Sequence, residues 1–205
     1  FNGNKRMEKV LKRIMDIILS VVLIIVALPL LVVVSLIIVI DDGFPVLFVQ
    51  KRVGYRRRMF SIIKFRTMHV DAPQAATREL INPDRYITRF GRFLRRTSID
   101  ELPQLFNILS GKMSLVGPRP VVENETQLIA LRERYGIYSL KPGVTGWAQI
   151  NGRDLISVED KVRMDRYYLE NQSFLLDLKI ILRTIHVVLF QHGIHEGCFE
   201  ADERR

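Results

Sequence analysis

Asp100 and Glu101 are adjacent carboxylates, and arginines stand on both sides of them along the chain. An ionised aspartate can act as a nucleophile, and paired carboxylates can hold a divalent cation. Arg95 precedes the pair, and Arg119 follows it between two prolines that stiffen its loop. Arginine suits bidentate binding of phosphate. Carboxylates, arginines and an oxygen-binding cation are the groups that phosphoryl transfer uses, so this segment predicts that chemistry.

The same two carboxylates also have a purely structural explanation, as a helix cap followed by an acidic first turn. Taken alone, so short a motif favours that explanation. If Ser98 and Glu101 formed a capping box, Pro103 would fall inside the helix and remove a hydrogen bond. If Asp100 is the N-cap, Pro103 falls in the first turn, where its missing N–H costs nothing. We favour Asp100 as the cap, at the positive end of a helix dipole.

Two further cations belong to a predicted β-hairpin. Residues 46–49 and 59–63 are short β-prone runs, and residues 53–56 between them suit a turn. Lys64 and Arg66 follow the second run and share one face because side chains alternate along a strand. They therefore add to the predicted phosphate-binding charge.

A membrane segment precedes the hairpin. No charge occurs from Ile17 to Ile40, and a straight helix of that length would reach about 36 Å, against a hydrocarbon core of about 30 Å. Pro29 lies at its centre and predicts a kink, which leaves halves of about 18 Å each. Basic residues flank both ends, which favours a re-entrant segment; a kinked transmembrane helix is the alternative. We expect residues 1–40 to form this membrane segment and residues 41–205 one cytosolic catalytic domain.

Helical patterns dominate the remainder. Residues 121–135 and 158–170 are amphipathic, and a helix covered with arginines begins near Ile87. Residues 174–190 are apolar except for Asp177 and a stripe of Lys179, Arg183 and His186, which suits an interfacial or core helix. The predicted fold is therefore a helix-rich α/β (α+β) domain with one small hairpin.

Composition and net charge exclude some classes of protein and of site. The chain has 205 residues, a formal net charge of +9 and a single cysteine, so a disulfide framework is excluded and an anionic partner is indicated. No nucleic-acid-binding motif is present. His192, His195 and Cys198 could suggest a metal site, but a flexible tail is the favoured explanation. Trp147, Tyr167 and Tyr168 could stack on a base or sugar, although core packing is the commoner role of such aromatics.

Longer blocks of sequence carry a specific resemblance. The blocks are LKRIMD at 11–16, KFRTM at 64–68, RRTSIDELPQLFNILSGKMSLVGPRP at 95–120 and KPGVTGWAQINGR at 141–153. They occur in family order and, with the membrane run and a tail around Tyr167-Tyr168 and Leu176-Asp177, reach from about Lys9 to about Gly193. The sequence resembles the bacterial sugar transferases that act on polyprenyl phosphate, the monotopic phosphoglycosyl transferases.

That resemblance implies a location and a reaction. It implies a re-entrant helix broken at its proline, on the cytosolic face of the bacterial inner membrane. The implied reaction transfers a sugar-1-phosphate from a UDP-sugar to undecaprenyl phosphate and releases UMP, by a ping-pong route through a phosphosugar–aspartate. The resemblance implies that this reaction is the first membrane step of bacterial glycoconjugate synthesis. Expected partners are both substrates and membrane lipids, without nucleic acid; a homo-oligomer is compatible with the sequence.

The resemblance also assigns residues. Asp100 would be the nucleophile and Glu101 its neighbour, both holding Mg²⁺. The expected phosphate- or substrate-binding residues are Arg95, Arg119, Lys64, Arg66 and Gln104. Two alternatives of another class remain at this point: a membrane-tethered module that binds nucleic acid or acidic lipid without catalysis, and a non-catalytic membrane scaffold in which Asp100 only caps a helix.

Overall fold

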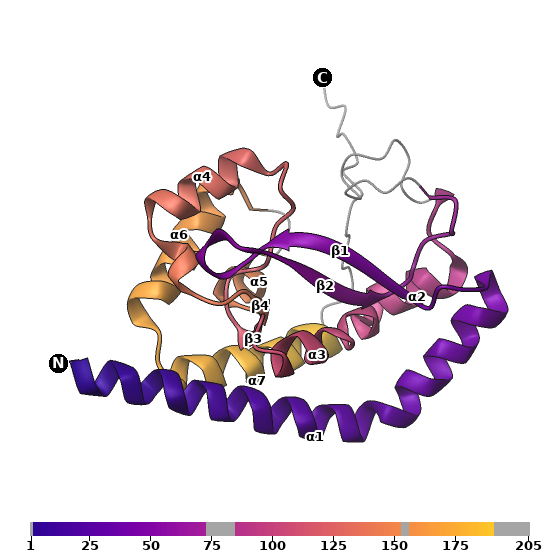
Figure 1. Cartoon of the computed structure of the whole chain (residues 1–205), viewed down its shortest axis with the longest axis horizontal. Helices are drawn as coiled ribbons and strands as arrows, with labels where there is room; N and C mark the ends of the chain where they lie inside the picture. The colour runs from indigo at the N-terminus through magenta and orange to yellow at the C-terminus, as the bar shows by residue number, and fades with distance from the viewer. Residues whose placement is uncertain (1, 73–84, 153–155, 191–205) are drawn as a thin grey trace.

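The structure is a computed structural model that describes residues 2–72, 85–152 and 156–190. Helices dominate it, and two small two-stranded sheets lie among them (Figure 1). The elements in chain order are α1 (Asn2–Asp42), β1 (Leu47–Val53), η1 (Tyr55–Arg57), β2 (Met59–Phe65), α2 (Arg89–Thr97), η4 (Ile99–Glu101), α3 (Gln104–Leu109), β3 (Ser114–Val116), α4 (Thr126–Arg134), η5 (Ile137–Ser139), β4 (Gly143–Thr145), α5 (Trp147–Asn151), α6 (Val158–Asn171) and α7 (Phe174–Phe190). The prediction of a helix-rich α+β fold is confirmed.

Helix α1 is long and apolar enough to cross a membrane, by length and composition. It contains Pro29, yet the helix is continuous from Asn2 to Asp42. The predicted break at Pro29 therefore does not divide the helix in two. Proline removes one backbone hydrogen bond, and the bonds on either side of that gap still hold the helix together. The ribbon bends in its second half (Figure 1), as expected of a helix that has lost one bond.

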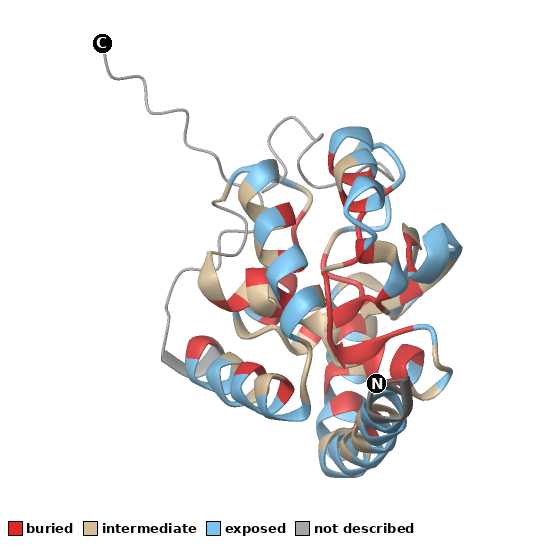
Figure 2. Ribbon diagram, turned by 90° about the vertical axis from the view of Figure 1, so that its left-hand side faces the viewer, coloured by how far each residue is buried: buried red, intermediate tan, exposed pale blue. Residues whose placement is uncertain are grey.

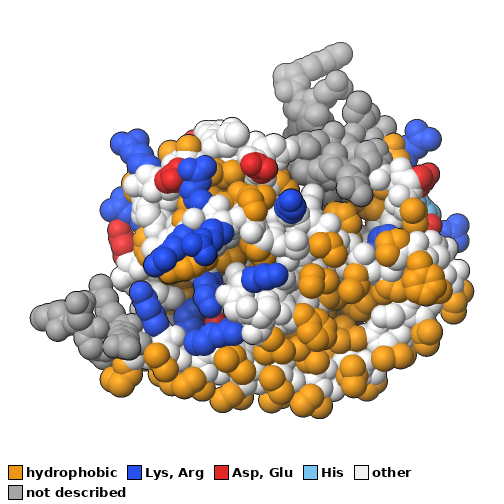
Figure 3. Space-filling model, in the orientation of Figure 1, with side chains coloured by type: hydrophobic (Ala, Val, Ile, Leu, Met, Phe, Trp, Pro, Cys, Tyr) orange, Lys and Arg blue, Asp and Glu red, His pale blue; other side chains and the backbone are white. Residues whose placement is uncertain are grey.

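The outer side of α1 exposes aliphatic side chains. Val26 is 73% exposed and Ile40 is 84% exposed, while Leu31, Val34 and Ile38 are buried against the rest of the protein. Figure 2 shows the buried residues gathered above α1 and the exposed ones on its outer surface. Figure 3 shows apolar side chains along the whole lower edge, where α1 lies. So much exposed apolar surface marks an interaction site for lipid or protein.

Helix α1 is fastened to the same body on both sides of its apolar run. Just before the run, Asp16 is buried and accepts hydrogen bonds from Ser114 Oγ (3.1 Å) and Leu115 N (3.0 Å). At its far end, the Asp42 carboxylate pairs with Arg66 at 3.1 Å. The helix therefore leaves from, and returns to, one folded domain.

The predicted hairpin is confirmed. Strands β1 and β2 are antiparallel, from Leu47↔Phe65 to Val53↔Met59. Gly54 N donates to Arg58 O across the turn, and η1 lies within it. The side chain of Asn107 in α3 binds β2 as a strand would: its Oδ1 accepts from Ile63 N at 3.0 Å and its Nδ2 donates to Ser61 O at 2.8 Å. This fixes α3 beside the strand that carries Lys64.

A second sheet pairs β3 with β4 in parallel. The chain just after β3 lies close to the start of β4, and a Cβ on Gly117 would sit 2.3 Å from Lys141 O. Gly117 is needed for that close approach. The loop that follows carries Arg119 between two prolines. It begins at Gly117, whose backbone is packed tightly against the start of β4.

The predicted helices are present with adjusted ends. The pattern at 121–135 forms α4 over Thr126–Arg134, that at 158–170 forms α6, and that at 174–190 forms α7. The helix expected near Ile87 is α2 and begins at Arg89, capped by Thr88 Oγ1, which accepts from Gly91 N. Residues 73–84, 153–155 and 191–205 lie outside the described part, and with them His192, His195 and Cys198.

Candidate active site

Asp100 lies in a single 3₁₀ turn, η4, between α2 and α3. Ser98, in the left-handed region at φ 57°, turns the chain out of α2, and α3 begins at Gln104 with Pro103 as its N-cap. The predicted cap is therefore wrong, since Asp100 does not cap α3; Ser98, the alternative, does not cap it either. Pro103 has no N–H, so regular helical bonding starts only after it, and the turn before it uses shorter bonds such as Leu102 N to Ile99 O. The Asp100 side chain is buried in this turn.

Glu101 receives two cations from distant parts of the chain. Lys64 Nζ lies 2.7 Å from Glu101 Oε1, and Arg119 Nη2 lies 3.2 Å from the same oxygen. Burial of the carboxylate raises its pKa, but Lys64 and Arg119 together outweigh that effect and lower the pKa of Glu101 to about 2. Glu101 is thus a fixed negative charge at neutral pH that holds two cations beside Asp100.

A buried ion pair supports the loop that carries Arg119. Arg132 in α4 donates to Asp165 Oδ2 of α6 from Nε at 2.9 Å and from Nη2 at 2.6 Å. Its third nitrogen, Nη1, donates to Arg119 O at 2.8 Å. Burial raises the pKa of the Asp165 carboxyl, and the charge of Arg132 opposes that shift. One guanidinium therefore ties two helices to the backbone of Arg119.

Arg95 reaches the site region from the last turn of α2. Its Nε donates to Thr67 Oγ1 at 2.8 Å, and its Nη1 is buried without a hydrogen-bond partner in the structure. Gly91 permits this packing, because a Cβ there would lie 2.1 Å from Thr67 O. An anchored guanidinium with an unused N–H is suited to an anionic ligand.

Arg66 and Gln104, two further residues predicted to bind substrate, form no side-chain hydrogen bond or ion pair with Glu101 in the part of the chain that the structure describes. Arg66 Nη2 donates to Asp42 O and Gly43 O, each at 2.8 Å, and pairs with the Asp42 carboxylate, so it anchors the end of α1. Gln104 is buried, and its Nε2 has no hydrogen-bond partner in the structure. The predicted substrate contacts of these two residues stay predictions.

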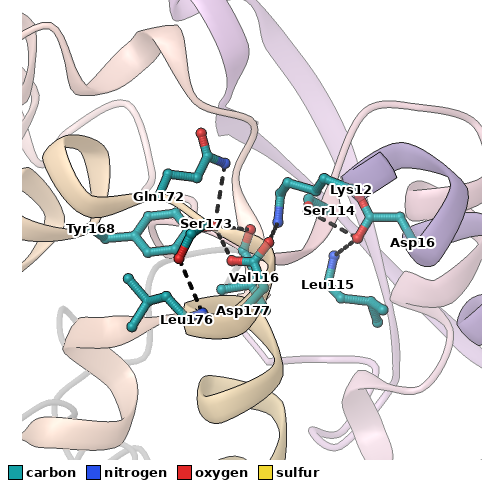
Figure 4. A network of polar contacts seen from close by, with 10 residues as sticks. All are labelled: Lys12, Asp16, Ser114, Leu115, Val116, Tyr168, Gln172, Ser173, Leu176 and Asp177. Atoms are coloured by element: carbon teal, nitrogen blue, oxygen red, sulfur yellow. Dashed lines mark hydrogen bonds and ion pairs between the residues drawn. The ribbon is translucent and has the colours of Figure 1, made fainter. Parts of the chain in front are cut away.

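A polar network joins α1 to α7 (Figure 4). Lys12 Nζ lies 2.7 Å from Asp177 Oδ2, and Tyr168 Oη donates to Asp177 Oδ1 at 2.6 Å. Burial raises the pKa of the Tyr168 hydroxyl, and the Asp177 charge raises it further. Tyr168 is thus a buried structural residue. By contrast, Trp147 stacks on the half-exposed Tyr167 with ring centroids 5.1 Å apart.

The structure thus brings Lys64, Glu101 and Arg119 into direct contact, with Asp100 next to Glu101 in the same turn and Arg95 one short turn upstream. With Arg95 counted from its place in the chain, this region holds three cations and two carboxylates, an excess that favours phosphate ligands. Sequence reasoning missed Arg132 and Asp165. The signal was available: Arg132 is spaced by four from Leu128, and Asp165 by three from Val162, so each falls on the apolar face of its helix.

A sequence profile of the family described as "Bacterial sugar transferase" matches residues 7–191. The chain belongs to the bacterial sugar transferase family. The matched range includes α1 from Met7 onward and every residue of the candidate site. Family membership gives no support to the alternative of a non-catalytic nucleic-acid-binding module.

Relatives in this family carry informative names. The chain is 44% identical over 193 residues to the undecaprenyl-phosphate glucose phosphotransferase of Komagataeibacter xylinus, which covers 89% of this chain and 36% of the relative. It is 38% identical to the UDP-glucose:undecaprenyl-phosphate glucose-1-phosphate transferase of Escherichia coli, covering 87% of this chain and 40% of the relative. It is 39% identical to an uncharacterized sugar transferase, EpsL, of Bacillus subtilis, covering 95% of each. The chain therefore spans well under half of the first two relatives and nearly all of the third.

Proposed function

We propose that this sugar transferase moves a sugar-1-phosphate from a UDP-sugar to undecaprenyl phosphate and releases UMP. The names of the K. xylinus and E. coli relatives support both substrates. The observation that carries the proposal is the contact of Glu101 with Lys64 and Arg119 immediately beside the buried Asp100. Such a site offers a nucleophilic carboxylate next to cations that bind phosphate.

The proposed reaction has two steps. A carboxylate oxygen of Asp100 attacks the sugar-bearing phosphorus of the UDP-sugar; the Asp–O–P bond forms, the bond to the bridging oxygen breaks, and UMP leaves with that oxygen. A phosphate oxygen of undecaprenyl phosphate then attacks the same phosphorus. The diphosphate bond of the product forms and the Asp100 carboxylate is restored. Two steps keep two anionic substrates from having to meet in the site.

The remaining residues have supporting roles in this proposal. Glu101 holds Lys64 and Arg119 in place, so that their charges stabilise the phosphate as it transfers. The buried N–H of Arg95 is free of protein partners in the structure and suits a diphosphate oxygen. Asp100 and Glu101 would hold Mg²⁺, since this ion needs only one or two protein carboxylates besides substrate phosphates, and the ion would neutralise diphosphate charge.

We place this domain on the cytosolic face of the membrane with α1 as a re-entrant helix. Its two ends are bound to one domain through Asp16 and Asp42, which supports a segment that enters and returns on the same side. Apolar side chains of α7 are also exposed; they include Leu175 and Leu182 at 75% and 59%. They suit an interfacial helix beside α1.

The test is a panel of UDP-sugars, incubated with full-length protein, undecaprenyl phosphate and Mg²⁺, with UMP release as the readout. We expect UMP release from at least one donor and a covalent phosphosugar on Asp100 when the acceptor is omitted. Asp100→Asn should lower turnover at least a thousandfold, because the amide is a poor nucleophile. Retained membrane insertion of this variant is the control. Turnover by Asp100→Asn near the wild-type rate would remove Asp100 from the nucleophile role.

A further inference from the structure

Basic side chains collect at the end of α3 that is remote from Asp100. The guanidinium of Arg13, in α1, donates to Ile108 O at 2.7 Å and Leu109 O at 2.9 Å, which are carbonyls at the last turn of α3. A Cβ built on Gly111 would lie 3.6 Å from Arg13 Nη2 and 3.8 Å from Lys141 Nζ. Two cations therefore flank Gly111, and the exposed Lys112 is the next residue along the chain.

This cluster carries more positive than negative charge. Lys12 is paired with Asp177, and the buried Asp16 is the other carboxylate nearby. Among the described residues, Arg13, Lys112 and Lys141 form no ion pair with a carboxylate. Partial burial of Lys141 lowers the pKa of its ammonium group, and the charge of Arg13 lowers it further, against the attraction of Asp16. An anion bound here would relieve that repulsion.

The cluster lies beside the apolar surface of α1. Arg13 precedes the uncharged stretch that starts at Ile17, and Ile14, Ile17 and Ile18 have exposed side chains. In the view of Figure 3, Lys and Arg side chains gather on the left-hand side of the molecule, directly above the apolar lower edge. A phosphate held at the cluster would thus have apolar surface next to it, which is the arrangement of a phospholipid: a charged headgroup and acyl chains.

We propose that Arg13, Lys112 and Lys141 form a site for the phosphate of an anionic membrane phospholipid, with its acyl chains along the exposed isoleucines of α1. The site is separate from the transfer site, because the six residues of α3, about 9 Å of helix, lie between them. It rests on membrane association of this chain and does not depend on the transfer reaction. A lipid there fixes the depth at which α3, and so Asp100, meets the membrane surface.

The experiment uses the full chain in micelles of a neutral detergent, titrated with phosphatidylglycerol or phosphatidylcholine, with bound lipid counted by native mass spectrometry. We expect the wild-type protein to prefer phosphatidylglycerol. A basic residue near an anionic headgroup is worth on the order of a fivefold change in binding, so Lys141→Gln should weaken phosphatidylglycerol binding about fivefold and the double variant with Lys112→Gln roughly 25-fold. Phosphatidylcholine binding should not change.

Two controls separate the site from general charge. Lys141→Arg keeps the charge and should bind as wild type does, and Lys51→Gln removes an exposed lysine from β1 and should have no effect. Lys112 is exposed, so Lys112→Gln alone gives a folded variant in which binding should still fall. Phosphatidylglycerol binding by the double variant at the wild-type level would overturn the proposal.

A competition experiment with inorganic phosphate tests whether the site is specific for lipid. Inorganic phosphate at millimolar concentration should not displace phosphatidylglycerol, since it lacks the acyl chains. Equal competition by inorganic phosphate would overturn the assignment to lipid and define a site for free phosphate. Loss of lipid binding with normal UMP release is expected for the variants in detergent. Absence of UMP release from the wild-type protein, with lipid binding intact, would instead reject the proposed transferase function alone.

Discussion

Asp100 and Glu101 are adjacent carboxylates, and the contacts of Glu101 limit the chemistry that Glu101 can do. Glu101 Oε1 already accepts from Lys64 and Arg119, and its pKa is lowered to about 2. A carboxylate stabilised to that degree is a poor nucleophile, because nucleophilicity falls as basicity falls. The division of labour in the proposed mechanism follows: Asp100 attacks, and Glu101 organises the cations around it.

The lowered pKa of Glu101 predicts a pH dependence of stability. A carboxyl whose folded pKa is depressed stabilises the fold above its unfolded pKa, near 4.5, and this contribution is lost as the pH falls through about 2. Glu101→Gln should therefore lower the unfolding temperature at pH 5–8, and its difference from wild type should shrink as the pH falls from 4.5 towards 2. Thermal unfolding in detergent across this range measures it.

Glu133→Gln is the matched control, because Glu133 pairs with Arg57 at the surface, where both side chains are about half exposed. Surface pairs contribute little, so this variant should track wild type at every pH. A Glu101→Gln protein as stable as wild type at neutral pH would show that the two cations do not stabilise the carboxylate.

Single residues also mark the limit of sequence reasoning. Lys64 and Arg66 share a strand face by spacing, yet Lys64 binds Glu101 while Arg66 binds Asp42 at the end of α1. The alternation of side chains fixes a face, but which partner meets that face depends on the packing of distant segments. The motif around Asp100 and Glu101 could be found from sequence; its connection to Arg132 and Asp165 needed the packing of α4 against α6.

At the scale of elements, local signals were sufficient where one pattern decides the structure. The hairpin and helices α6 and α7 follow from periodicity. The helix ends lie within one residue of the predicted ones, whereas β1 runs to Val53, four residues beyond its predicted end. The start of α3 was mispredicted because the capping rules assume that a regular helix begins at the cap. Here a 3₁₀ turn, η4, comes first, and Pro103 postpones the α-helix to Gln104.

The loop between β3 and α4 owes its position to Arg132, and this predicts a kinetic effect at a distance. Arg132→Lys keeps a cation beside Asp165 but cannot also donate to Arg119 O, so the loop loses its tether. We expect kcat for UMP release to fall roughly tenfold, as for other residues that orient a site's ligands, and the unfolding temperature to fall as well, because buried hydrogen bonds of the guanidinium are lost. Steady-state kinetics and thermal unfolding measure the two effects.

Arg57→Lys serves as the control for this prediction, since Arg57 forms an exposed pair on the hairpin turn and touches no site residue described in the structure. It should leave kcat unchanged. An Arg132→Lys enzyme with wild-type kcat would mean that Arg119 holds its position without the tether.

At the scale of the whole molecule, the course of α1 determines on which side of a membrane its two ends lie. A straight span would carry one end of the helix to the far side of the bilayer. In this structure, Asp16 and Asp42, on either side of the apolar run, bind the same domain. Exposed apolar side chains such as Val26 lie between them, although a stripe of this run is buried against the domain. Length and composition alone could not separate these two courses, since both need the same apolar run.

Topology is therefore the last prediction. With Cys198 replaced by serine, single cysteines at Lys9→Cys and Lys51→Cys report the two sides of α1, since both native residues are exposed. A re-entrant helix leaves both on the cytosolic side, so a membrane-impermeant maleimide should label neither in intact spheroplasts and both after lysis. A periplasmic-loop cysteine in an unrelated inner-membrane protein is the control for reagent access. Labelling of exactly one of the two positions in intact spheroplasts would establish a span, and it would require α1 to release one of its two attachments to the domain.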